Sequence, residues 1–251
     1  MEIAMKTPAL AFALAVVLAG TSPASAQQAA AVDPKAIKAL AQIGEKLRSL
    51  REYTVSADVK TRAPMASGRY KDFRGTAKYQ VRAPDHLRAA TRGIGFDRDI
   101  VFDGRTITVF SPTQKHYARI DAPGTLSTLV STVEQRTGFR MVLAQLFTWD
   151  DQAKLLQGAE RASYSGEALV GGRSCAHYSY KKDGIAWEVF ADAQHLPCKL
   201  AFVDTRDTNL PGYDAELTWV ERTTLPDSTF QFTPPAGASE VGWDAFKATG
   251  K

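Results

Sequence analysis

The stretch IVFDGRTITVF, residues 100–110, contains two short apolar runs on either side of Asp103-Gly104. Asp-Gly between apolar runs is the strongest short-range signal of a β-hairpin, because these two residues accept the backbone angles of a tight turn. The stretch therefore predicts two adjacent antiparallel strands joined at Asp103-Gly104.

Apolar and polar residues alternate with a period of two on both sides of this hairpin, which is the pattern of half-buried strands. Ala83-Pro84-Asp85 and Gly171-Gly172 are typical of turns between such strands. The further strands that the pattern predicts lie at residues 53–59, 73–81, 87–91, 115–120, 162–170, 174–181, 185–191, 198–205 and 213–222, with a short last one from Phe230 that Pro234-Pro235 ends.

Two regions have the three- and four-residue apolar spacing of helices instead. The first begins at Asp33-Pro34, a capping residue followed by proline, and its apolar stripe starts at Ala36. The second is a helical insertion at about 125–159, with helices expected at residues 126–133, 141–149 and 152–156. Many short antiparallel strands with one helical insertion predict a single α+β domain, residues 33–251, built on one large meandering sheet.

The N-terminal residues have the pattern of a signal peptide. Lys6 precedes an apolar run over residues 9–19, and Ala24-Ser25-Ala26 supplies the small residues that signal peptidase recognises. An N-terminal anchor helix is the alternative, but the apolar run is too short to span a bilayer. We expect residues 1–26 to be removed, residues 27–32 to form a flexible lead-in, and the protein to be periplasmic. No Cys follows the apolar run, so we expect no lipidation.

The composition excludes several classes of protein. Of the 251 residues, 44% are apolar, too many for a disordered chain, and the two cysteines are too few for a disulfide-packed miniprotein. No apolar run after the signal approaches the ~20 residues of a membrane-spanning helix, so we expect no transmembrane segment once the signal is removed. The 31 basic residues are dispersed among 27 acidic ones, which argues against a nucleic-acid partner.

The sequence lacks the common motifs of catalysis and cofactor binding. There is no His-Glu-x-x-His, no Gly-x-Ser-x-Gly and no phosphate loop, and Gly93-Ile-Gly95 lacks the third glycine of a dinucleotide-binding turn. Asp pairs such as Asp97 and Asp99 fall at expected loops, where Asp is favoured for its local hydrogen bonds. We therefore expect a non-enzymatic protein without a cofactor or a metal ion.

Three states of Cys175 and Cys198 are compatible with the sequence. Exported chains with two cysteines usually oxidise them, so a disulfide is the favoured state. In a simple meander, however, the two would lie on either side of Phe190, and two strand spacings of ~4.8 Å exceed the ~7 Å limit for bridging. A bend before Cys198, or an early end of the middle strand, would remove this difficulty. The alternatives are two reduced thiols, or a zinc ion bound together with His177 and His195.

Several motifs follow one another along the chain: YTVSAD (53–58), VRAPDHLR (81–88), FDGRTITV (102–109), VGGRSCAH (170–177) and LPDSTF (225–230). In this order they resemble a bacterial family of predicted periplasmic proteins classed as a domain of unknown function, which is similar to the outer-membrane lipoprotein carriers. The resemblance implies a strongly curled, incomplete antiparallel β-barrel with helices on its concave side. In the lipoprotein carriers, that concavity holds acyl chains.

Aromatic residues in the expected strands are the remaining indication of function. They either fill the space between sheet and helices or line a concavity that is open to a ligand. The candidate ligand contacts are Tyr79, Phe102, Phe110, Tyr178, Trp187, Phe202 and Trp219. The first hypothesis is a carrier, chaperone or sensor that binds a lipid, an acyl chain or a lipoprotein. The second is a protein with a filled core that recognises another envelope protein.

The signal-peptide interpretation predicts the mature N-terminus. We expect protein exported to the periplasm to begin at Gln27, because signal peptidase cleaves after small residues such as those at 24–26. N-terminal sequencing of the exported protein measures this directly, and an intact Met1 or Met5 would contradict it.

Overall fold

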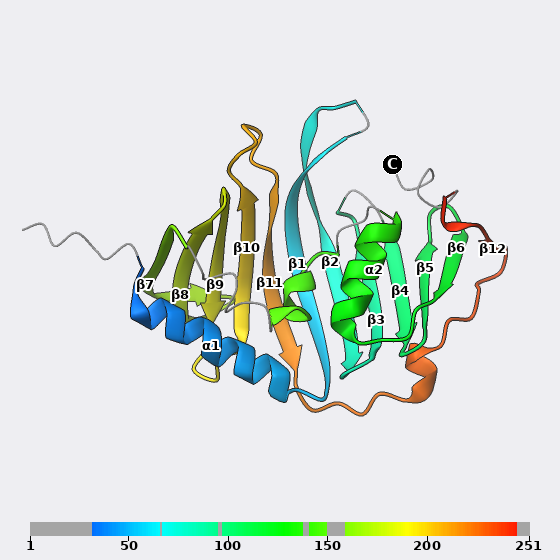
Figure 1. Ribbon diagram of the computed structural model, residues 1–251, viewed down its shortest axis with the longest axis horizontal. Helices are drawn as coiled ribbons and strands as arrows, with labels where there is room; N and C mark the ends of the chain where they lie inside the picture. The colour runs from blue at the N-terminus through cyan, green and yellow to red at the C-terminus, as the bar shows by residue number, and fades with distance from the viewer. Residues whose placement is uncertain (1–31, 66, 95–96, 138–140, 150–158, 245–251) are drawn as a thin grey trace, which may run out of the picture.

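One twelve-stranded sheet runs through the whole of the described chain (Figure 1). The computed structural model describes residues 32–65, 67–94, 97–137, 141–149 and 159–244. The helices are α1 (Pro34–Ser49) and α2 (Leu126–Thr137), with short 3-10 helices η1 (Ala144–Leu146) and η3 (Asp227–Phe230). The strands are β1 (Glu52–Pro64), β2 (Tyr70–Arg82), β3 (His86–Arg92), β4 (Arg98–Asp103), β5 (Thr106–Ser111), β6 (His116–Asp121), β7 (Arg161–Val170), β8 (Arg173–Lys182), β9 (Ile185–Ala191), β10 (Pro197–Asp204), β11 (Gly212–Val220) and β12 (Ser239–Glu240).

The strand order shows that the sheet is open and meandering. It is β12-β6-β5-β4-β3-β2-β1-β11-β10-β9-β8-β7, so β12 and β7 are the two edges. All neighbours are antiparallel except β12, which runs parallel to β6. The expected α+β class with one large antiparallel sheet is confirmed.

The two halves of the sheet meet at the pairing of β1 with β11. Strands β2–β6 continue from β1 on one side, and strands β7–β10 continue from β11 on the other. In this pairing Val55 lies opposite Trp219, and Arg62 lies opposite Gly212. The first strand and the last long strand of the chain therefore form the middle of the sheet.

Most expected elements are confirmed within a few residues, including the hairpin at Asp103-Gly104 and the helix that Asp33 caps. The helix expected at 141–149 is wrong: Leu143 has a left-handed φ of 60°, which an α-helix does not accommodate, and only the η1 turn follows it. The strand expected from Phe230 is also wrong, because η3 ends there and the last strand is β12. The helix expected at 152–156 lies outside the described residues.

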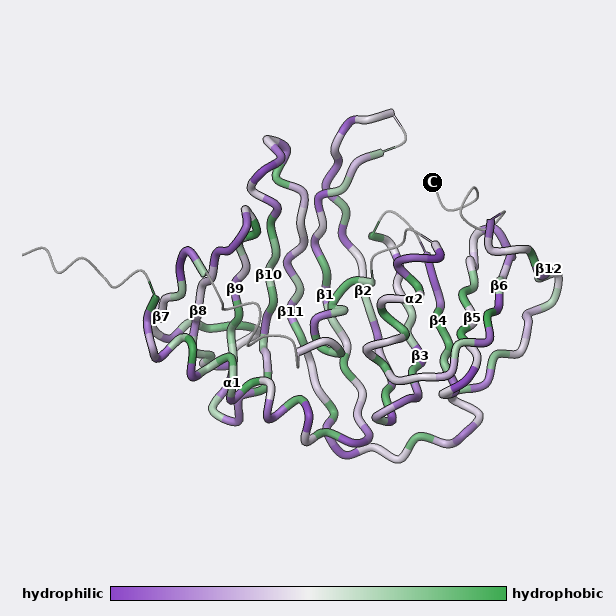
Figure 2. The backbone as a smooth tube through the Cα atoms, viewed as in Figure 1, coloured by the Kyte–Doolittle hydropathy of each residue, from purple (hydrophilic) through white to green (hydrophobic). Residues whose placement is uncertain are grey.

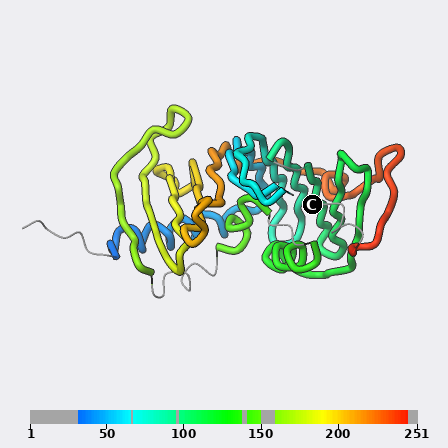
Figure 3. Tube along the Cα trace, turned by 90° about the horizontal axis from the view of Figure 1, so that it is seen from above, coloured from blue at the N-terminus to red at the C-terminus, as the bar shows by residue number. Residues whose placement is uncertain are grey.

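Both helices cover the same face of the sheet, called here the inner face (Figures 1 and 3). Alternate residues of strands β1–β11 belong to the main core on this face. The hydropathy changes repeatedly along the strands (Figure 2). In β1, for example, Tyr53, Val55, Ala57 and Val59 are buried there. Helix α1 lies across β7–β11 and α2 across the other half, and residues 141–149 add Leu143, Leu146 and Trp149 to the same core.

The C-terminal residues pack along the opposite, outer face and the β6 edge. Arg82 donates hydrogen bonds to the carbonyl oxygen of Leu225 and to Asp227, which fixes the start of η3. Phe232 packs on Phe110 and Tyr117, with ring centroids 5.6 and 5.2 Å apart. Beyond this point β12 pairs with β6, so the edge of that half carries only a two-residue strand, which limits pairing with other chains.

Helix α1 is held against the inner face at several points along its length. Tyr180 donates a hydrogen bond to the carbonyl oxygen of Ala36 (2.9 Å), and the indole of Trp149 donates to that of Leu40 (3.0 Å). Lys46 forms an ion pair with Glu221 at the C-terminal end. At Gly44 the helix approaches Trp149 so closely that a Cβ atom would lie 2.7 Å from the indole Cδ1.

This contact predicts that Gly44→Ala destabilises the protein, although alanine is the better helix former. Alanine in a helix interior gains about 1 kcal/mol over glycine, but overpacking a rigid contact costs about 1–3 kcal/mol. We expect a net loss of about 1 kcal/mol in the free energy of unfolding, measured by urea denaturation. As a control, Gly44→Ala in a Trp149→Leu background should be stabilising, since the clash is absent. A single Gly44→Ala variant more stable than wild type would contradict the packing.

Candidate functional site

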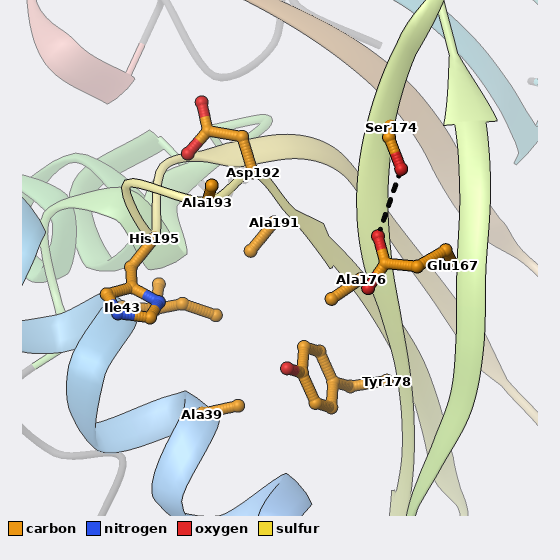
Figure 4. Close-up of a pocket in the computed structure, with 10 residues that line it drawn as sticks. All are labelled: Ala39, Ile43, Glu167, Ser174, Ala176, Tyr178, Ala191, Asp192, Ala193 and His195. Carbon is orange, nitrogen blue, oxygen red and sulfur yellow. Dashed lines mark hydrogen bonds between the residues drawn. The ribbon is translucent and has the colours of Figure 1, made fainter.

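A cavity of about 260 Å³ lies between helix α1 and the inner face of strands β7–β9 (Figure 4). Three parts of the chain form its wall: the middle of α1, the inward residues of β7–β9, and the turn that joins β9 to β10. The residues that line it are Ala39, Ile43, Glu167, Ser174, Ala176, Tyr178, Ala191, Asp192, Ala193 and His195.

The cavity exists because small residues stand where large ones fill the rest of the inner face. Ala39 on α1 faces the sheet, and Ala176 and Ala191 are neighbours in the pairing of β8 with β9. Further along the same two strands, the inward positions carry Tyr180 and Trp187, which fill the space beneath α1. The alanines thus leave this part of the α1–sheet contact hollow.

The wall of the cavity combines apolar and polar residues, and its two carboxylates are held by local hydrogen bonds. Glu167 accepts hydrogen bonds from the hydroxyls of Tyr164 and Ser174, both at 3.1 Å. Asp192 accepts from backbone N–H groups of its own turn, including that of Leu196 at 2.9 Å. These carboxylates therefore organise the strand and the turn.

Tyr178 presents its ring and hydroxyl to the cavity (Figure 4). Burial raises the pKa of this hydroxyl, and its electrostatic interactions with Tyr164, Glu167 and Asp33 raise it further. The group is therefore neutral at ordinary pH. It can accept or donate a hydrogen bond without placing a charge in the cavity.

Of the seven aromatic residues that the sequence suggests as ligand contacts, Tyr178 alone lines this cavity. Tyr79, Phe102 and Trp187 lie on the inner face but are packed in the core, at most 6% exposed. The ring of Tyr79 contacts Phe147 at 5.5 Å, and that of Trp187 stacks on Tyr180 at 5.3 Å.

The other three residues also have partners within the protein. Phe202 packs on the main core and stacks on Tyr213 (5.4 Å). The indole of Trp219 donates to the carbonyl oxygen of Pro197 (2.7 Å). Phe110 lies on the outer face against Phe232, so a ligand on the inner face would not reach it.

Sequence reasoning missed the alanines and the β9–β10 turn. The sequence feature that could have indicated them is a set of small residues at inward positions of neighbouring strands. Small side chains there leave space between the sheet and the helix. A search for aromatic side chains does not detect it.

Cys175 and Cys198 form a disulfide on the outer face, with their Cα atoms 6.6 Å apart. Two features bring them together. Strand β9 ends at Ala191, which pairs with Ala176 on one side and Pro197 on the other, so no β9 residue separates the cysteines. The register of β10 also shifts between Pro197 and Lys199. The disulfide, Val170 and Phe190 form a small second core.

The zinc alternative has no support in the described residues. His177 stacks on Phe190 on the outer face (4.1 Å between centroids), whereas His195 is on the wall of the cavity. No three His, Cys, Asp or Glu side chains in the described ranges gather in a way that could hold a metal ion. No helix there combines the length and hydrophobicity needed to cross a bilayer.

Comparison with known families gives one match over most of the chain. The model of a family described as predicted periplasmic protein (DUF2092) matches residues 36–243. This confirms the resemblance that the motif order indicates. No curated protein matches the chain.

Several solved structures are distantly similar. The Mycobacterium tuberculosis lipoprotein LppX has 14% identity and a TM-score of 0.47, over 77% of this chain and 100% of its own. LprF from Mycobacterium bovis has 9% identity and a TM-score of 0.48, over 77% and 97%. A LolA superfamily protein from Nitrosomonas europaea has 12% identity and a TM-score of 0.36, over 78% and 97%. At TM-scores below 0.5, these likenesses say nothing of a ligand for this chain.

We expect the disulfide to contribute measurably to the free energy of unfolding. It links residues 23 apart, and closing a loop of that size stabilises a folded chain by about 3 kcal/mol. We expect a Cys175→Ala/Cys198→Ala variant to lose about that much in urea denaturation. In wild-type protein from the periplasm, iodoacetamide should label neither cysteine until a reductant is added. Rapid labelling of two thiols without reductant would contradict the bond.

Proposed function

This chain belongs to the family of predicted periplasmic proteins (DUF2092) and is periplasmic, and on that premise we propose that it binds an apolar chain in the cavity between α1 and β7–β9. The ligand class is an acyl chain, presented by a lipid or by a lipoprotein. The protein would act as a carrier, chaperone or sensor of that ligand rather than as an enzyme.

The cavity itself is the observation that carries this proposal. Its volume of about 260 Å³ is slightly below the range of about 300–1,000 Å³ that is usual for small-molecule sites. Such a space suits one segment of a hydrocarbon chain, with the rest of the ligand outside. Ala39, Ile43, Ala176 and Ala191 offer this segment a surface without unpaired polar groups.

The binding energy expected from this surface is moderate. Removing apolar surface from water gains roughly 25 cal/mol per Å², so a chain segment that buries about 200 Å² would gain about 5 kcal/mol. Part of this gain is lost to the ordering of the ligand. The result is reversible binding, as a carrier or sensor requires.

The polar groups at the cavity do not form a hydrolytic site. Ser174, Glu167 and His195 are the residue types of a catalytic triad, in which the histidine lies between the nucleophile and the acid. Here the Ser174 hydroxyl donates directly to Glu167, and His195 forms no hydrogen bond to either of them. This arrangement supports binding rather than catalysis.

A second candidate function is recognition of another envelope protein without an acyl ligand. One observation favours it: in the described residues, Tyr79, Phe102 and Trp187 are packed against other core residues, so most of the inner face is filled. On this alternative, the alanine-lined cavity is a packing defect.

The test is to fill the cavity by substitution. We expect wild-type protein to bind a long-chain lysophospholipid or a diacylated lipopeptide in calorimetric titration. Ala176→Phe should weaken that binding at least tenfold, because the new ring occupies the space of the chain. The matched control is Ala186→Phe, on the outward side of the neighbouring strand β9, which should bind as wild type does.

Two results would overturn the proposal. If neither compound changes the calorimetric signal or the melting temperature, recognition of an envelope protein becomes the better interpretation. If Ala176→Phe binds as tightly as wild type while its circular dichroism is unchanged, the ligand binds elsewhere.

A further inference from the structure

Two neighbouring hairpins extend beyond the rest of the sheet at one end (Figure 1, top). In the β1–β2 hairpin, pairing continues to Pro64 opposite Tyr70. The flanking strands stop earlier, at Gly212 opposite Arg62 and at Arg92 opposite Thr76. The last part of this hairpin therefore extends beyond the pairing with its flanking strands.

The β10–β11 hairpin lies beside it, and side-chain hydrogen bonds join the two, one of them from the Thr61 hydroxyl to the carbonyl oxygen of Gly212 (2.9 Å). The Tyr70 hydroxyl donates a hydrogen bond to Asp207, and this bond lowers the pKa of the Asp207 carboxyl. The other acidic residue of that turn, Asp204, pairs with Arg206 at 2.7 Å. The acidic groups of the β10–β11 turn are thus bound to partners within the two hairpins.

The β1–β2 hairpin is strongly basic. Residues 60–74 contain five basic residues and one acid, Asp72, which pairs with Arg62 at 3.0 Å. Lys60, Arg69, Lys71 and Arg74 are exposed and form no ion pair within the described part of the chain. Lys71 contacts the ring of Phe73 at 5.4 Å.

Two of these cations oppose one another within the hairpin. Lys60 and Arg74 are direct cross-strand partners, and like charges in such positions destabilise a strand pair. Asp214 lies on the other side of Lys60, but it is bound to Lys199 at 2.5 Å. The hairpin therefore keeps a repulsive pair that an anionic surface would relieve.

Apolar side chains are exposed at the ends of both hairpins. Met65 is 41% exposed next to Pro64, and Leu210 is 51% exposed on the neighbouring turn. Exposed apolar residues at the apex, followed by cations, are typical of protein segments that bind to a membrane surface. There, apolar groups enter the headgroup layer and cations remain near the phosphates.

We propose that these hairpin ends, residues 60–65 and 67–74 with Leu210, dock on an anionic phospholipid surface of the envelope. The charge of the segment favours such a surface over a neutral one, and its few apolar side chains make the binding reversible. An acidic protein is the other partner that such a charge could attract, but Met65 and Leu210 are better accounted for by lipid.

The docking surface and the cavity are separate. Strand β10 begins next to the β9–β10 turn, which lines the cavity, and ends at the hairpin. Eight residues of strand span roughly 26 Å, so the cavity and the hairpin ends lie at opposite ends of β10. The two proposals can therefore fail independently.

The test is flotation of the full mature chain with vesicles. We expect co-flotation with vesicles of phosphatidylcholine and phosphatidylglycerol, little with phosphatidylcholine alone, and release in 0.5 M salt because salt screens exposed charges. An Arg69→Gln/Lys71→Gln/Arg74→Gln variant should bind roughly a hundredfold more weakly. Met65→Ser/Leu210→Ser should weaken binding by a smaller factor.

The matched control removes three exposed cations elsewhere, as Lys38→Gln/Arg105→Gln/Arg222→Gln, and should bind as wild type does. Ala176→Phe should also float as wild type does, which separates this proposal from that of the cavity. The proposal is overturned if wild-type protein does not float, if it binds neutral vesicles equally, or if the hairpin variant binds like the control. Failure to float together with capture of an acidic protein would also overturn it.

Discussion

An open sheet of twelve strands exposes a continuous apolar surface on one face, and the rest of this structure depends on how that face is covered. A closed barrel would bury it by curvature alone. Here the cover consists of α1, α2 and residues 141–149, which share one core with the inward side chains of the strands. The hydrogen bonds from Tyr180 and Trp149 to α1 carbonyl oxygens hold this cover in place. Where the facing residues are alanines, the cover leaves a hollow.

The outer face needs little cover because most of it is exposed to water. Its polar and charged side chains need no cover, and two of the apolar clusters on this face are informative. One is the disulfide with Val170 and Phe190, and the other is the contact of Phe232 with Phe110 and Tyr117. Both places lie towards the ends of the strand order, where covalent or C-terminal links tie down strands that have fewer neighbours.

The strands are predicted well because apolar and polar residues alternate along each of them, and this pattern can be read from neighbouring residues alone. Phe110 shows the limit of that reasoning: residues 107–111 are all buried because both faces are covered there, so alternation cannot assign a side. The state of the cysteines depends on where β9 ends, and a propensity pattern does not fix a strand end to one residue. The cavity depends on Ala39 meeting Ala176 and Ala191 across more than a hundred residues of chain, a long-range contact that no local pattern contains.

The pairing of β1 with β11 has a consequence for biogenesis. A chain exported from its N-terminus delivers β1 to the periplasm early, but its partner at residues 212–220 arrives only after most of the chain has crossed. Until then β1 has β2 on one side only, and α1 lacks strands β7–β11, which it covers in the native protein. Contacts between residues so distant along the chain form slowly, and unpaired strand edges are open to aggregation in the meantime. The native sheet is therefore completed only after translocation is nearly finished, and during that interval β1 and α1 lack part of their native cover.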